Sequence, residues 1–146
     1  MAVQRHVNWE FAERALGSIL PGSTAYSADR IVGIPARAWE RFDIEGRDAG
    51  VVEEDFLGRC VGLGGLLIVV NDASFDADQG PFFVEAGHLA QFVRQFDRVT
   101  GGDFFGYPGA IVVSLATGVV VVVQEDGYIA TVHGTPLGEL QAPVDR

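Results

Sequence analysis

The residues best suited to chemistry are three aspartates that share one short loop, Asp72, Asp76 and Asp78. Carboxylates this close together could hold Ca²⁺ or Mg²⁺ through oxygen ligands, or receive a partner's arginine and lysine side chains in charge-assisted hydrogen bonds. The loop is not an EF-hand, because no glutamate stands twelve positions into it. We therefore predict no metal, and a contact surface for a basic partner. The alternative is ordinary turn and helix-capping chemistry.

A second acidic group, Glu53, Glu54 and Asp55, stands upstream of this loop. Adjacent acids could include a general acid or base, but such catalysis depends on a geometry that sequence does not define. Neighbouring acids on a helix more often form a solvated face. We assign these three residues to the same partner-binding surface.

A glycine-rich loop between residues 101 and 109 carries the aromatic residues Phe104, Phe105 and Tyr107. It lacks the lysine and the following Ser or Thr of a phosphate-binding loop. Aromatic side chains often anchor protein interfaces, so we predict these three residues as partner contacts. The alternative is that Phe104 and Phe105 fold back into the core while the glycines form turns.

No other motif indicates catalysis. The three histidines are far apart in the sequence and in no metal-binding pattern, and no G-x-S-x-G motif is present. Cys60 falls on the apolar side of a predicted helix, which is typical of a small core residue rather than a nucleophile. We predict no catalytic residue and no cofactor, which favours a non-catalytic protein.

The charge distribution also favours a basic partner. The chain has 146 residues and a net charge of −10. From Glu40 to Glu85, eleven acids stand against three arginines, which leaves −8 there and −2 for the rest of the chain. An acidic surface repels the phosphates of nucleic acid, so we predict no nucleic-acid binding. Solubility alone is the other explanation of the acidity.

All ten basic residues are arginine, so the chain has no P-loop lysine and no Schiff-base lysine. Together with abundant alanine, glycine and valine, this composition indicates a GC-rich bacterial genome. The single cysteine excludes an internal disulfide. Neither a secretory signal nor an apolar run of about 20 residues is present, so we predict a cytoplasmic protein that does not enter the membrane.

The helices and strands that position these residues are predicted from the pattern of apolar residues. Apolar residues three to four positions apart predict a helix, and short runs of β-branched residues predict a strand. The predicted helices are Trp9–Leu20 with Asn8 as its cap, a short helix Pro35–Phe42, Val51–Val61 and Glu85–Phe96. The predicted strands are Leu66–Val70, Phe82–Val84, Ala110–Leu115, Gly118–Gln124 and Tyr128–His133, with Tyr26–Ile34 as a strand or an extended stretch.

Helices come early and the clearest strands come late, which predicts an α+β fold. We expect an antiparallel sheet of about five strands, with helices mainly on one face and a C-terminal β-meander. Five consecutive valines from Val119 to Val123 predict a central strand covered on both faces. Residues 1–134 form the predicted domain, and residues 135–146 a loosely ordered tail.

In size, acidity and lack of a catalytic motif, the chain resembles bacterial immunity and inhibitor proteins such as barstar-like or SUKH-type antitoxins. That resemblance implies a non-catalytic module whose acidic face binds a basic protein partner. One alternative is a small-molecule-binding or enzymatic domain, with a pocket between the sheet and the 85–96 helix and Asp103, Tyr107 and His133 as polar groups. Another is a structural homo-oligomer in which the valine-rich strands continue a sheet across a dimer.

Overall fold

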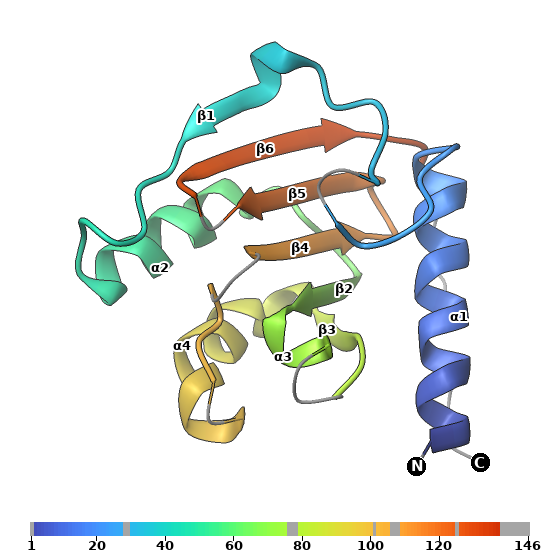
Figure 1. Cartoon of the computed structure of the whole chain (residues 1–146), viewed down its shortest axis with the longest axis horizontal. Helices are drawn as coiled ribbons and strands as arrows, with labels where there is room; N and C mark the ends of the chain where they lie inside the picture. Colours follow the sequence, from blue (N-terminus) through green and yellow to red (C-terminus); the bar gives the residue numbers. More distant parts are fainter. Residues whose placement is uncertain are drawn as a thin grey trace.

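The five valines form the middle of one antiparallel sheet. The computed structural model describes residues 2–27, 30–75, 79–100, 102–105, 109–124 and 126–137, and the side chains from residue 8 onward. Within them, six strands lie in the order β1-β6-β5-β4-β2-β3 (Figure 1). The strands are β1 (Trp39–Arg41), β2 (Leu66–Asn71), β3 (Phe82–Glu85), β4 (Gly109–Ser114), β5 (Val119–Gln124) and β6 (Tyr128–His133).

The helices are distributed along the chain between the strands, and the longest connection runs from the end of α1 at Ile19 to η1 at Ala36. The α-helices are α1 (Ala2–Ile19), α2 (Ala49–Arg59), α3 (Asp72–Phe75) and α4 (Leu89–Thr100), and the 3₁₀ helices are η1 (Ala36–Ala38) and η2 (Ala86–His88). The α+β class and the antiparallel sheet that the sequence predicts are therefore confirmed. No helix in the described ranges is both long and apolar enough to cross a membrane.

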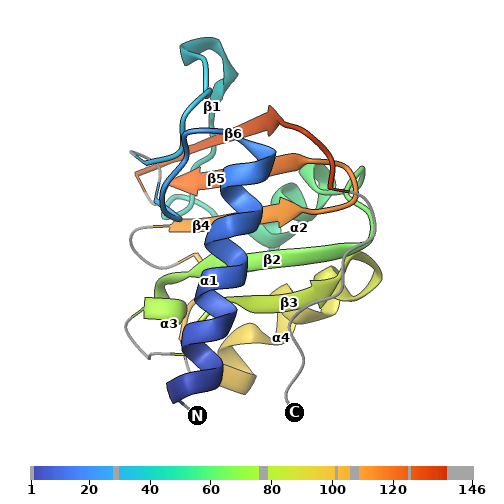
Figure 2. The ribbon, with the colours of Figure 1, turned by 90° about the vertical axis from the view of Figure 1, so that its right-hand side faces the viewer.

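Helices lie on both faces of the sheet, with α2 and α4 together on one face and α1 on the other. Alternate residues of a strand point to opposite faces. Val121 and Val123 of β5 accordingly pack with α2 and α4, whereas Val120 and Val122 pack with α1. Figure 2 shows α1 in front of the sheet and α2 and α4 behind it. A strand that is apolar on both faces needs cover on both. Full burial of each valine side chain contributes about 1.5–3 kcal/mol to the stability of the fold.

Strand β5 pairs with β4 on one side and β6 on the other. The predicted central position of the valine strand is therefore confirmed. Strand β5 therefore has no free edge at which it could pair directly with a strand of a second copy. Among the described strands, the outer positions belong to β1 and β3.

Two predicted elements near the N-terminus need correction. Helix α1 begins at Ala2, so Asn8 lies inside the helix and does not cap it. No strand forms over the described part of 26–34; instead, the Tyr26 hydroxyl donates a 2.6 Å hydrogen bond to the carbonyl oxygen of Ala12 in α1. Burial raises the pKa of Tyr26, with a further contribution from the charge of Glu13.

The predicted short helix over 35–42 is split into η1 and β1. The split places Trp39 opposite Ala130 of β6 and leaves Phe42 fully buried beneath α2. At the other end of the chain, the amide of Thr135 donates to the carbonyl of Ile19, and that of Leu137 to the carbonyl of Leu115. Residues 138–146 of the predicted tail lie outside the described part of the chain.

Candidate functional site

An aromatic seam joins α2, α4 and the loop that precedes β4. The rings of Phe104 and Phe105 lie 4.9 Å apart edge to face, and Phe56 of α2 contacts both, at 5.6 and 5.2 Å between centroids. Phe96 of α4 completes the seam against Phe104, at 5.5 Å. Phe104 is buried and Phe105 is partly buried, so these two predicted contact residues pack inward and do not project as free anchors.

Asn71 at the end of β2 holds the aromatic loop in place. Its side-chain amide donates a 3.1 Å hydrogen bond to the carbonyl oxygen of Phe104, and the residue is almost fully buried. A buried polar group of this kind is costly to leave unpaired, so the bond favours a single position of the loop. The third aromatic residue of the predicted contact, Tyr107, lies outside the described residues.

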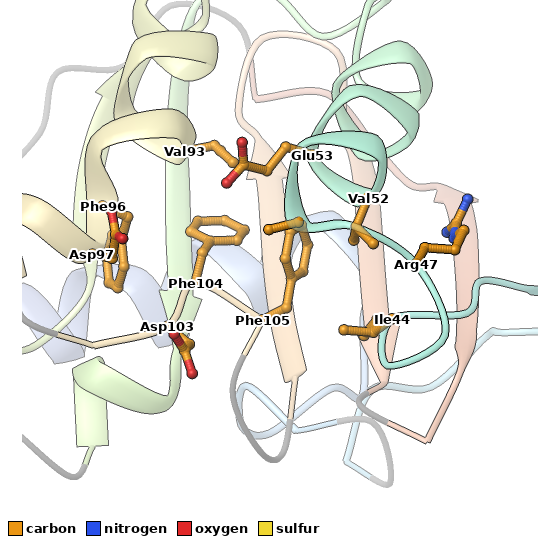
Figure 3. Close-up of a pocket in the computed structure, with 11 residues that line it drawn as sticks. Ile44, Arg47, Val52, Glu53, Val93, Phe96, Asp97, Asp103, Phe104 and Phe105 are labelled. Carbon is orange, nitrogen blue, oxygen red and sulfur yellow. The ribbon is translucent and has the colours of Figure 1, made fainter.

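The seam does not close completely at the surface. A pocket of about 240 Å³ remains between α2 and α4, with Phe104 and Phe105 in its lining and Ile44, Val52 and Val93 on its sides (Figure 3). Pockets for small molecules usually have volumes of about 300–1,000 Å³. This one is smaller, with room for a single side chain or a comparably small group.

Three carboxylates border the pocket: Glu53 on α2, Asp97 on α4 and Asp103 in the aromatic loop. Within the described part of the chain, none of the three forms an ion pair. Glu53 is half-buried, and Figure 3 shows its carboxylate in the space between the two helices, beside Val93. Asp97 and Asp103 are exposed at the rim.

The cation that lines the pocket, Arg47, is already engaged elsewhere. Its Nη1 lies 2.9 Å from Asp55 Oδ2, and its Nε donates to the carbonyl of Asp43 at 2.7 Å. The guanidinium lies over the ring of Phe42, 5.2 Å from its centroid, and Figure 3 shows it turned away from Phe105. Its stem therefore forms one wall, while its charge is directed to Asp55.

Asp55 is shared between two arginines. Arg59 Nε approaches Oδ1 at 3.1 Å from the other side. Partial burial alone would raise the pKa of Asp55, but the hydrogen bonds and charges of Arg47 and Arg59 outweigh it and hold the pKa below its ordinary value. Arg59 also bonds Glu40 at 3.0 Å, which ties α2 to the edge strand β1.

The three acidic residues of α2, Glu53, Glu54 and Asp55, therefore have different roles. Glu54 forms an ion pair with Arg94 across the helix–helix seam, and Asp55 is bound by its two arginines. Both carboxylates are used within the fold. Of the three predicted contact residues on α2, only Glu53 keeps its charge for a ligand at the pocket.

Asp72, the described aspartate of the acidic loop after β2, is not part of this pocket. Asp72 begins the single-turn helix α3 and has partners of its own, whereas Asp76 and Asp78 lie outside the described residues. In the ranges that are described, no three His, Cys, Asp or Glu side chains come together as a metal site would require. Asp72 does not line the α2–α4 pocket.

Of the polar groups in the small-molecule hypothesis, Asp103 and His133 lie apart, and Tyr107 is outside the described residues. Asp103 is next to Phe104, whose carbonyl oxygen accepts a hydrogen bond from Asn71 at the end of β2. Asn71 pairs with Ala110 near the start of β4, at the end of the sheet where β6 begins. His133 is the last residue of β6, about 17 Å along a strand from that end. Asp103 and His133 therefore lie toward opposite ends of the sheet.

A second, more apolar hollow does lie between the sheet and the predicted 85–96 helix. A groove of about 540 Å³ runs between the outer strand β3 and α4. Phe82, Phe92 and Val99 give it an apolar surface, and Glu85 is the only carboxylate among its described lining residues. This groove and the α2–α4 pocket lie on opposite sides of Phe96, which lines both.

Cys60 conforms to its expected structural role. It is buried at the end of α2, and burial raises its pKa to about 12, so the thiol is neutral at physiological pH.

The sequence did not identify Arg47 and Asp97 as parts of a site. The available signal was the position of Glu53 and Asp97 directly beside the apolar stripes of their helices, which places both at the edge of a packed face.

The chain has no match among protein-family models, curated protein sequences or solved structures.

Proposed function

We propose that the protein is a non-catalytic, immunity-like binding module whose acidic surface at the α2–α4 seam binds a basic protein partner. The observation that carries the proposal is the pocket bordered by Glu53, Asp97 and Asp103, whose carboxylates have no ion-pair partner among the described residues. Three uncompensated negative charges around an apolar depression attract a cationic surface and raise its rate of association.

The neighbouring ion pairs support this location over the rest of the acidic surface. Glu54 and Asp55 are neutralised by Arg94, Arg47 and Arg59. A partner that used these carboxylates would exchange existing ion pairs for new ones, with little net gain, because pairs this exposed contribute only about 0–1 kcal/mol each. Glu53 requires no such exchange. The predicted binding surface is therefore centred on Glu53 rather than distributed over the whole acidic group.

A labelled cationic peptide tests the proposal, with nine residues alternating between arginine and glycine. Fluorescence anisotropy at rising ionic strength should show binding that weakens steeply with salt. The triple variant Glu53→Gln, Asp97→Asn, Asp103→Asn should bind about tenfold more weakly than the wild type.

The matched control removes three exposed acids elsewhere, by Glu13→Gln, Glu85→Gln and Asp126→Asn. Both triple variants change the net charge equally, so a difference between them measures location and not total charge. Equal losses in the two variants, or binding that ignores salt, would contradict the proposal.

A second candidate function, binding of a small apolar ligand, is favoured by the groove between β3 and α4. Its volume of about 540 Å³ lies in the range typical of ligand pockets. An apolar naphthalene dye should bind there, and Val99→Asp should weaken binding several-fold. Val61→Asp is the matched control, because Val61 and Val99 are 81% and 79% exposed and only Val99 lines the groove. Equal effects of the two substitutions would exclude the groove.

A further inference from the structure

The α2–α4 pocket combines three properties that together specify a ligand. It is small, at about 240 Å³. Its floor is aromatic, formed by Phe104 and Phe105. Its border is acidic, with Glu53 placed deepest of the three carboxylates, since Glu53 is half-buried while Asp97 and Asp103 are exposed.

The aromatic floor distinguishes this pocket from a simple acidic patch. The face of an aromatic ring attracts a cation within about 6 Å of its centroid, and the attraction is stronger where water is excluded. The ring pair in this structure is edge to face, with an angle of 80° between the planes of Phe104 and Phe105. Both rings and Glu53 line the pocket, so a ligand bound there can contact an aromatic ring and a carboxylate at the same time.

Next to the pocket, a similar pair of an aromatic ring and a carboxylate binds the guanidinium groups of arginine. Arg47 and Arg59 place their guanidinium groups over the ring of Phe42, 5.2 and 5.8 Å from its centroid, and both bond Asp55. The ring of Phe42 and the neighbouring Asp55 carboxylate therefore bind two guanidinium groups, close to the pocket. Phe105, whose ring centroid lies 6.0 Å from that of Phe42, lines the pocket together with the Glu53 carboxylate.

We propose that the pocket receives one arginine side chain of the basic partner, with its guanidinium against Phe105 and bonded to the Glu53 carboxylate. This inference rests on the proposed function and narrows it to one residue type. Guanidinium is planar, weakly hydrated and able to donate two parallel hydrogen bonds to a carboxylate, whereas ammonium is a compact and strongly hydrated charge. The pocket therefore selects arginine over lysine.

Peptides that differ at one position test this selectivity. A ten-residue peptide with a single central arginine is compared with versions that carry lysine or citrulline there, citrulline being similar in shape to arginine and uncharged. Calorimetry at low salt should rank arginine above lysine by about threefold to tenfold, with citrulline weakest. Glu53→Gln should lower the affinity for the arginine peptide about tenfold and remove its advantage over citrulline.

Glu13→Gln, the same substitution on α1 across the sheet, should leave the ranking unchanged. Phe105→Leu keeps an apolar group and should reduce the preference for arginine over lysine while both peptides still bind. Methylguanidinium, which should compete more strongly than methylammonium, provides a second readout on the wild-type protein.

The outcomes separate this inference from the proposed function. If basic peptides bind with a steep salt dependence, but arginine and lysine are equivalent and Glu53→Gln behaves like Glu13→Gln, the arginine pocket is refuted and the acidic binding surface stands. If no basic peptide binds at low salt, both are refuted.

Discussion

Arg47 and Asp55 form an ion pair that joins the loop before α2 to the middle of that helix, with 2.9 Å between Nη1 and Oδ2. The pair has two consequences. It fixes α2 relative to Phe42, because the same guanidinium lies over that ring. It also pairs the positive charge of Arg47 with Asp55, so Arg47 does not neutralise the carboxylates that border the α2–α4 pocket.

Asp55→Asn should destabilise the fold by about 1–2 kcal/mol, because it leaves two half-buried arginines without their shared carboxylate. Urea denaturation followed by circular dichroism measures the change in the free energy of unfolding. Glu45→Gln is the control, since Glu45 is exposed in the loop before α2. A Glu45→Gln effect as large as that of Asp55→Asn would show that charge count, not the ion pair, sets stability.

The contribution of Asp55 should depend on pH in a defined direction. Its pKa is lower in the folded protein than the ordinary value of about 3.9. The unfolded chain therefore binds the proton more readily, and the stabilisation is complete above about pH 5 and lost as the pH falls through the folded-state pKa. The difference in unfolding free energy between wild type and Asp55→Asn should be constant from about pH 5 to 8 and shrink below about pH 4. A difference that grows on acidification would contradict this assignment.

Asn71→Ala should affect both stability and the pocket. It removes the amide that bonds the carbonyl of Phe104 and leaves that buried oxygen without its partner, at a cost of about 1–3 kcal/mol. Because the bond positions the aromatic loop, affinity for the arginine peptide should fall as well, measured under conditions where the variant is fully folded. Normal affinity in a folded variant would show that the loop does not depend on Asn71.

Two glycines should respond in opposite ways to alanine. Gly109 begins β4 at φ +133°, and a Cβ there would lie 1.9 Å from the carbonyl oxygen of Val123, so Gly109→Ala should destabilise by several kcal/mol or prevent folding. Gly58 lies inside α2 with nothing within 4 Å of a new Cβ, so Gly58→Ala should stabilise by about 0.5–1 kcal/mol. Thermal unfolding distinguishes them, and a loss of stability in Gly58→Ala would be inconsistent with the helix described here.

Local patterns predicted most of the elements. The valine run predicted a central strand, and the spacing of Leu89, Val93 and Phe96 predicted a helix on this segment, because these signals arise within a few neighbouring residues. The helix over 2–19 was predicted too short because Asn8 is a residue type that favours the N-cap position, yet it lies within the helix.

The site could be predicted only in part. Glu53 and the aromatic residues of the loop were identified from sequence, but their juxtaposition was not. Pairing α2 with α4 requires knowing that both helices cover the same face of the sheet, and two strands separate them in the chain. The ion pair of Glu54 with Arg94 could not be predicted for the same reason, since it joins α2 to α4. This pair removes Glu54 from the proposed binding surface.

The most direct measurement of the central claim is an NMR titration of the ¹⁵N-labelled protein with the single-arginine peptide. The account predicts that backbone amide shifts at saturation concentrate on residues around the pocket, with Val52, Glu53, Val93 and Phe105 among the largest. Shifts centred instead on the groove between β3 and α4, or on Asp72 and α3, would contradict it.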